Sequence, residues 1–203
     1  MVQHLVLMLF AAPLFAMARV PATMLLRRQR EGRVHVPVII RPSVRLLLRT
    51  PAGLAWFVQF VVLWLWHTPF AFSAATNNPW IHAAQHASFL GVATWYWASI
   101  LRGFGRGTRQ ATGVALLSLF MSALHSSVLG AFLALVQTPL YVVSHANGHV
   151  LTTLQDQQLA GLLMWVPGSV VYLLAAMLLA RRLASESRGR EHPPSEVPQS
   201  SSL

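Results

Sequence analysis

Long apolar runs separated by shorter polar segments dominate the hydropathy pattern of this chain. The runs fall at residues 2–18, 52–72, 80–101, 111–136 and 157–180. A helix needs about 20 predominantly apolar residues to cross a bilayer, so each run is close to spanning length. The pattern predicts an all-α fold: a polytopic membrane helix bundle of about five transmembrane helices, forming one domain over residues 1–183.

The segments between and after these runs are polar. Residues 19–50 hold eight arginines and three prolines, which rule out one long helix, and we expect an amphipathic interfacial piece near residues 38–48. Residues 184–203 are rich in Ser, Pro, Glu and Arg and have almost nothing apolar to bury. We therefore expect a disordered cytoplasmic tail there.

Composition and charge narrow the class of protein. Of the 203 residues, 55% are hydrophobic and only 10% are charged, and the mean hydropathy is +0.52, as in integral membrane proteins. The net charge of +10 would suit nucleic acid if it lay on one soluble surface, but the arginines fall between the apolar runs. The bilayer is therefore the expected partner, and nucleic acid is not.

The arginines also predict an orientation. Short cytoplasmic loops carry an excess of basic residues, and all fifteen basic residues of this chain are arginines outside residues 73–79 and 137–155. These two uncharged segments are expected to face outward, which places the N-terminus outside and the C-terminus inside.

On this topology most histidines gather near the outer surface. His82 and His86 lie four residues apart, so in a helix they share one face and can address one metal ion. His4 begins the first run and His67 lies near the end of the second. Single histidines at an interface are more often ordinary interfacial residues, and it is their accumulation on one side that favours a site.

A polar stripe in the fourth run is harder to attribute to the interface. Ser118, Ser122 and His125 lie on one helical face and should face other helices. An unpartnered imidazole at mid-membrane depth is costly, so we expect His125 to be hydrogen-bonded to Ser122 or Ser126, or to be bound to a ligand. We predict that it joins the same site as the i, i+4 histidine pair.

The remaining candidates are less specific. Asp156 opens the last run and is either a helix N-cap or a hydrogen-bond partner of a metal-bound histidine, and Met121 is either packing or a soft ligand. The chain has no cysteine, so a soft metal such as copper would have to be held by histidine and methionine. The full set of candidate metal ligands is His4, His67, His82, His86, His125, Met121 and Asp156.

Several short motifs stand out along the chain. The most specific is the stretch from Asp156 to Gly168, Asp-Gln-Gln-Leu-Ala-Gly-Leu-Leu-Met-Trp-Val-Pro-Gly. The others are Val2-Gln3-His4-Leu5, Ala11-Ala12-Pro13-Leu14, Leu65-Trp66-His67-Thr68-Pro69 and Gln85-His86. Together these motifs resemble the CtaG family of multi-pass cytochrome c oxidase assembly factors associated with caa-type oxidases.

The resemblance implies a multi-pass protein of the bacterial plasma membrane that assembles with cytochrome c oxidase subunits. It implies delivery of copper, bound stably or only in transit, taken from a periplasmic or extracellular donor. Family members usually carry further N-terminal spans, so we expect helices upstream of Met1.

Two other classes of function stay open at this point. A haem- or quinone-binding redox protein would also place histidines on facing helices, and a haem protein would show a Soret band. A small-ion transporter would use His and Asp156 as carriers, but it would need polar residues that continue to the cytoplasmic side. An enzyme is not expected, because the sequence lacks a nucleophile elbow, paired carboxylates and an HExxH motif.

Overall fold

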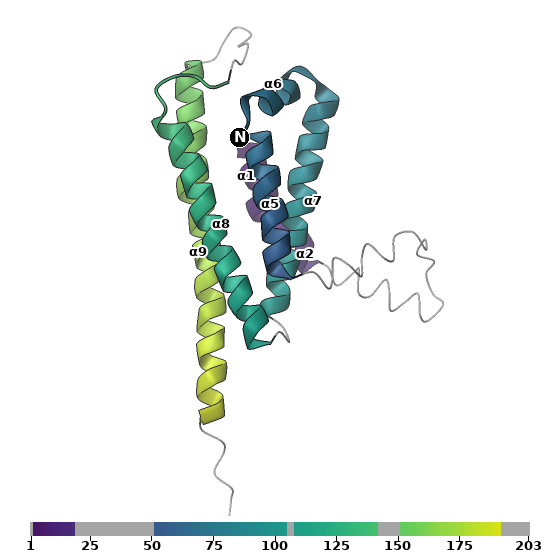
Figure 1. Cartoon of the computed structure of the whole chain (residues 1–203), viewed down its shortest axis with the longest axis vertical. Helices are drawn as coiled ribbons and strands as arrows, with labels where there is room; N and C mark the ends of the chain where they lie inside the picture. The colour runs from purple at the N-terminus through teal and green to yellow at the C-terminus, as the bar shows by residue number, and fades with distance from the viewer. Residues whose placement is uncertain (1, 19–50, 105–107, 142–150, 192–203) are drawn as a thin grey trace, which may run out of the picture.

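The computed structural model describes residues 2–18, 51–104, 108–141 and 151–191, and the regular structure of these residues is helical. The elements are α1 (Val2–Val6), the π-helix η1 (Leu7–Ala11), α2 (Ala12–Met17), α5 (Ala52–Trp66), α6 (Pro69–Asn77), α7 (Pro79–Phe104), α8 (Arg109–Leu135) and α9 (Thr153–Glu191) (Figure 1).

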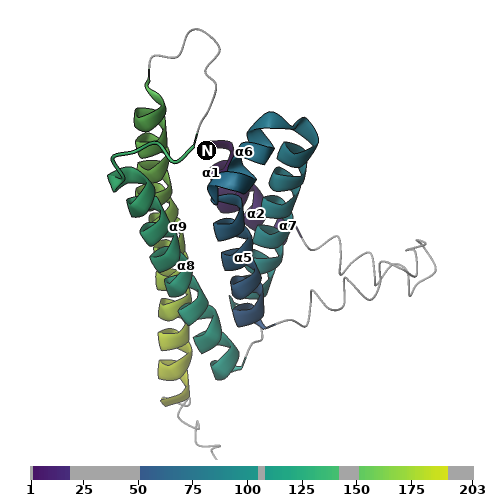
Figure 2. The ribbon, with the colours of Figure 1, turned by 45° about the horizontal axis from the view of Figure 1, so that its top comes forward.

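The helices form two groups that lie against each other. In both views α8 and α9 run side by side as an antiparallel pair, and α5, α7 and the N-terminal segment α1–η1–α2 make the second group (Figures 1 and 2). The short helix α6 crosses one end of the second group and leads into α7. The starts of α1 and α7 therefore lie at the same end of the molecule.

Helix-capping residues explain where several helices begin. Thr68 precedes Pro69 and accepts a hydrogen bond from Ala71 N–H at 3.4 Å, and Asn78 precedes Pro79 and accepts one from Trp80 N–H at 2.9 Å. Proline at the first helical position needs no N–H partner and has a helical φ already. The first pair, Thr68-Pro69, breaks the expected 52–72 run near its end, where α5 and α6 meet at 71°. The second pair, Asn78-Pro79, separates α6 from α7.

The N-terminal segment contains a turn of π-helix next to Pro13. Ala12 N–H donates to Leu7 O, one residue further back than in an α-helix, and Pro13 has no N–H to donate. The carbonyl of Met8 instead accepts the indole N–H of Trp97 on α7, at 3.0 Å. The Trp97 side chain thus connects α7 to the N-terminal segment at this carbonyl.

The described residues contain two helices long and apolar enough to cross a membrane, at Arg109–Leu135 and Thr153–Ser185. The bent pair of α5 and α6 makes a third if it is one span, and Gln3–Met17 is apolar but shorter. The fold is therefore an all-helical membrane fold, while the predicted number of five spans is not supported. The helix α7 is 26 residues long but is not among the candidates.

Two boundaries differ from those expected. Residues 73–77, expected in an outward-facing turn, belong to α6, and α9 continues to Glu191, into the segment expected to be a disordered tail. Between the end of the expected run at Ala180 and Gly189 the sequence holds no proline or glycine, the residues that most often end a helix. The amphipathic piece expected near residues 38–48 lies outside the described residues.

Candidate metal site

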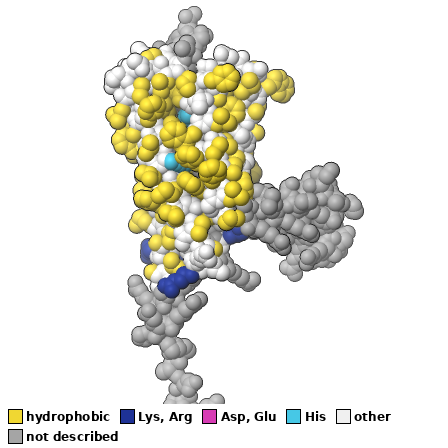
Figure 3. All heavy atoms as spheres, in the orientation of Figure 1, with side chains coloured by type: hydrophobic (Ala, Val, Ile, Leu, Met, Phe, Trp, Pro, Cys, Tyr) yellow, Lys and Arg dark blue, Asp and Glu magenta, His cyan; other side chains and the backbone are white. Residues whose placement is uncertain are grey.

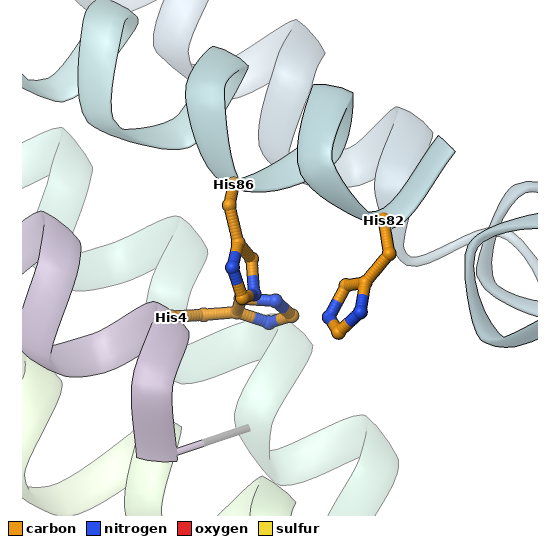
Figure 4. Close-up of side chains that lie close together, drawn as sticks. All are labelled: His4, His82 and His86. Carbon is orange, nitrogen blue, oxygen red and sulfur yellow. The ribbon is translucent and has the colours of Figure 1, made fainter. Parts of the chain in front are cut away.

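Three histidines from two distant parts of the chain meet at one end of the bundle. His82 and His86 lie one turn apart on α7, and His4 reaches them from α1 (Figure 4). One ring nitrogen of each residue lies within 4.8 Å of those of the other two. The ring centroids are 4.4 Å apart for His82 and His86 and 4.7 Å apart for His4 and His86. We call these three residues the histidine cluster.

Local structure explains how α7 presents its two histidines. The side chain of Asn78 caps the helix through Trp80 N–H and Ile81 N–H, so regular helix is established before His82. The i, i+4 spacing then points both imidazoles to the same side. The prediction that His82 and His86 share one face of a helix is therefore confirmed.

Ring nitrogens in the histidine cluster lack hydrogen-bond partners. His4 Nδ1 and His86 Nε2 are buried and have no partner among the described residues, whereas His82 is exposed. A buried polar atom without a partner costs about 1–3 kcal/mol. A ligand that accepts these lone pairs would remove that cost.

The spacing suits a single metal ion. Imidazole nitrogens bind first-row metals such as zinc at about 2.0–2.1 Å, so two nitrogens on one ion are at most about 4.2 Å apart. The observed limit of 4.8 Å is close enough for small side-chain rotations to bring all three nitrogens onto one ion. The residues present therefore fit a metal ion held by three neutral imidazoles.

His67 and His125 are not part of the histidine cluster. Both are 8% exposed, and both line a cavity of about 30 Å³ deeper in the bundle, where His4 is also a lining residue. His125 does not form a hydrogen bond with Ser122 or Ser126: Ser122 Oγ donates to Tyr96 OH at 3.0 Å, and neither ring nitrogen of His125 has a hydrogen-bond partner among the described residues. The polar stripe of Ser118, Ser122 and His125 is nevertheless buried, as predicted.

The remaining two candidates lie elsewhere. Met121 is partly buried on α8 and is not among the residues that line that cavity. Asp156 is exposed and is not the N-cap of α9, because Thr152 Oγ1 accepts from Gln155 N–H and Gln155 Oε1 accepts from Thr152 N–H. With this reciprocal capping box in place, Asp156 lies in the first turn of α9, where its negative charge interacts favourably with the helix dipole.

Sequence reasoning missed several residues around the cavity. Met8 and Met164 are not among the candidate ligands that the sequence indicated, and both line the cavity together with Tyr172. Tyr172 accepts a hydrogen bond from Gln59 Nε2 at 2.9 Å. The sequence does show a glutamine, Gln59, within one apolar run and a tyrosine, Tyr172, within another. It does not show that these two runs face each other.

Comparison with known proteins adds the family. Searches among curated proteins and among solved structures give no match. The model of the family described as cytochrome c oxidase caa3 assembly factor matches residues 1–186, which include the histidine cluster and every residue lining the cavity. Because that match covers nearly all of the helical chain, this protein belongs to the cytochrome c oxidase caa3 assembly factor family.

Proposed function

We propose that this assembly factor binds Cu(I) at the histidine cluster and hands it to cytochrome c oxidase during assembly. The observation that carries the proposal is the meeting of His4, His82 and His86, with ligand nitrogens within 4.8 Å and two of these side chains holding buried, unpartnered nitrogens. The family's role is assembly of an oxidase, and haem-copper oxidases need copper to become active.

The charge of the cluster favours a monovalent ion. No carboxylate joins the three imidazoles among the described residues, so the ion's charge would not be neutralised by its ligands. The cost of taking an ion out of water rises with the square of its charge, which penalises Zn²⁺ and Cu²⁺ more than Cu⁺. Imidazole is also a good copper ligand.

The position of the cluster supports uptake from outside the cell. The described arginines lie at the end of the molecule where α7 and α9 finish, as the dark blue atoms in Figure 3 show. The histidine cluster lies at the opposite end, where α1 and α7 begin. With arginines on the cytoplasmic side, the cluster would face a periplasmic or extracellular copper donor in a bacterial plasma membrane.

Copper binding can be measured directly on detergent-purified protein. Reduced copper is titrated against a chromophoric Cu(I) chelator, with the wild type and a His82→Ala, His86→Ala variant. We expect the variant to lose the ion bound by the cluster, because only the His4 imidazole remains and a single ligand does not hold the ion. A His4→Leu variant should weaken binding as well, although His4 is far from the pair in sequence.

The matched control removes two histidines that are expected on the cytoplasmic side. His35 and His192 are the two that the charge pattern assigns to the cytoplasm, and the His35→Ala, His192→Ala variant should bind as the wild type does. Equal copper retention by wild type and the His82→Ala, His86→Ala variant would refute the proposed site.

A further inference from the structure

A cavity lies where four segments of the bundle meet, deeper than the histidine cluster. Its volume is about 30 Å³, and it is lined from the N-terminal segment, the end of α5, α8 and α9. A site for one water needs about 10–15 Å³, so one metal ion or one to two waters would fit. We call it the inner cavity; its potential ligands are His4, Met8, His67, His125 and Met164.

His67 is oriented as metal-binding histidines usually are. Its Nδ1 lies 2.7 Å from the carbonyl of Leu63, which can only accept, so Nδ1 carries the proton. The other nitrogen, Nε2, then holds a lone pair, and it is buried without a hydrogen-bond partner. A backbone carbonyl that fixes the tautomer in this way is the usual outer partner of a metal-bound imidazole.

His125 faces the inner cavity, and its ring forms no hydrogen bond with the described residues. Both of its ring nitrogens are buried and unpartnered, and its other neighbours include the aromatic rings of Trp56 and Phe60, with centroids 6.1 and 5.4 Å away. These rings offer no strong hydrogen-bond acceptor. Two histidines with unsatisfied nitrogens at one cavity are difficult to explain as packing, because each unsatisfied group is costly.

Two thioether side chains also line the inner cavity. Met8 and Met164 are buried, at 7% and 5% exposure, whereas Met17 and Met177, further along the same segments, are 59% and 61% exposed. Thioether and imidazole groups together select Cu(I) among the biological metals. In the part of the chain that the structure describes, no acidic residue lines the inner cavity, which again favours a monovalent ion.

We propose that the inner cavity is a second Cu(I) site, held by His67 and His125 together with the sulfur atoms of Met8 and Met164. His4 belongs to the histidine cluster and also lines the inner cavity, so it can pass the ion from one to the other. This inference rests on the proposed function, because it makes the histidine cluster the entry point and the inner cavity the place where copper is held.

The two sites differ in ligand chemistry, and this difference can be measured. X-ray absorption at the copper edge of protein loaded with Cu(I) should show nitrogen and sulfur neighbours in the wild type. The Met8→Leu, Met164→Leu variant should lose the sulfur contribution, since leucine keeps the volume but not the ligand. The matched control is Met17→Leu, Met177→Leu, which removes exposed thioethers from the same segments and should keep the signal.

Stoichiometry from chelator titration gives an independent readout. We expect two bound Cu(I) in the wild type, and one each in the His67→Leu, His125→Leu variant and in the His82→Ala, His86→Ala variant. The ion left in the latter should keep its sulfur neighbours. Leucine in place of a buried, unpartnered histidine removes an unsatisfied group, so the fold should survive the first of these changes.

A third variant fills the inner cavity without removing a ligand. Gly168 lines it, and a Cβ built there would meet Ser126 Oγ at 3.4 Å and Leu5 Cδ2 at 4.0 Å, which is ordinary contact. Gly168→Leu would extend further into the space, so we expect it to abolish the sulfur-bearing copper and to leave the ion at the histidine cluster.

The results separate the two proposals. One bound ion with nitrogen neighbours only, unchanged by the methionine or Gly168→Leu variants, would overturn the inner site and leave the proposed function intact. A sulfur-bearing ion in a protein whose binding does not change in the His82→Ala, His86→Ala variant would support the inner site and refute the histidine cluster. A protein that binds no Cu(I) would refute both.

Discussion

Tyr141 shows how a single residue holds a candidate ligand in place. Its hydroxyl donates to the carbonyl of His67 at 2.8 Å, and its ring packs against Phe72 with centroids 4.1 Å apart. His67 lies just after the last turn of α5, where the backbone no longer follows the helix. The tyrosine therefore fixes the backbone of a residue whose orientation matters at the inner cavity.

Removal of this hydroxyl tests its contribution. In Tyr141→Phe the ring contact stays and the bond to His67 O is lost, so we expect a destabilisation of about 1 kcal/mol. Thermal unfolding of the detergent-solubilised protein measures the effect at neutral pH. An unchanged midpoint would show that water replaces the hydroxyl without cost.

The same pair of proteins should respond differently to alkaline pH. Burial raises the pKa of Tyr141 from the usual value of 10 to about 12. The folded state thus holds this proton more tightly than the unfolded state, and the stability tied to it is complete below pH 10 and is lost as pH rises toward 12. The advantage of wild type over Tyr141→Phe in unfolding temperature should therefore narrow between pH 10 and 12. A gap that widens instead would contradict the assignment.

At the level of elements, α8 and α9 depend on two glycines where they approach each other. A Cβ on Gly161 would lie 2.6 Å from Ala134 N and from Gly130 O, and a Cβ on Gly130 would lie 2.7 Å from Trp165 N. The obstructing atoms are backbone, which cannot rotate away. Close approach at small residues is a common way for membrane helices to associate.

Gly161→Ala should therefore destabilise the helix pair. A methyl group in that space forces the two backbones apart, and overpacking of this kind costs about 1–3 kcal/mol. Gly113→Ala on α8 is the control, because a Cβ there meets nothing within 4 Å and alanine favours helix over glycine. Thermal unfolding should fall for Gly161→Ala and stay level or rise for Gly113→Ala. Equal midpoints would mean that α8 and α9 can separate freely at this point.

At the scale of the whole molecule, the described arginines and the histidine cluster lie at opposite ends. Hydrophobic side chains cover the surface between the cluster's end and the arginines on the face shown in Figure 3. Such a distribution suits a bilayer with the basic end in the cytoplasm. The proposal of copper uptake from outside depends on this orientation.

The absence of cysteine makes the orientation straightforward to measure. Asn77→Cys places a thiol at the exposed end of α6, and Gln110→Cys places one at the exposed start of α8. In intact cells a membrane-impermeant maleimide should label Asn77→Cys, and Gln110→Cys should react only after the membrane is opened. The reverse pattern would place the histidine cluster in the cytoplasm and would refute uptake from outside.

Sequence periodicity and capping chemistry account for most of the helices. The apolar runs at 111–136 and 157–180 correspond to α8 and the middle of α9, and the 80–101 run lies inside α7. The sequence does contain a signal for the break near His67, because Thr68-Pro69 is a helix-capping pair. The residues on both sides of it are apolar, however, so the hydropathy pattern shows one continuous run. Length and hydropathy alone cannot distinguish a straight span from two helices joined at an angle.

For the candidate site, the sequence determined the pair on α7, and the tertiary structure decided the rest. Spacing of four residues places His82 and His86 on one face of any helix, because the geometry of a helix is local. Their meeting with His4, and the separation of His67 and His125 into a deeper cavity with Met8 and Met164, depend on which helices pack together. That packing is set by contacts between distant parts of the chain, such as Trp97 with the Met8 carbonyl and Gly130 against Gly161, which no local pattern of residues encodes.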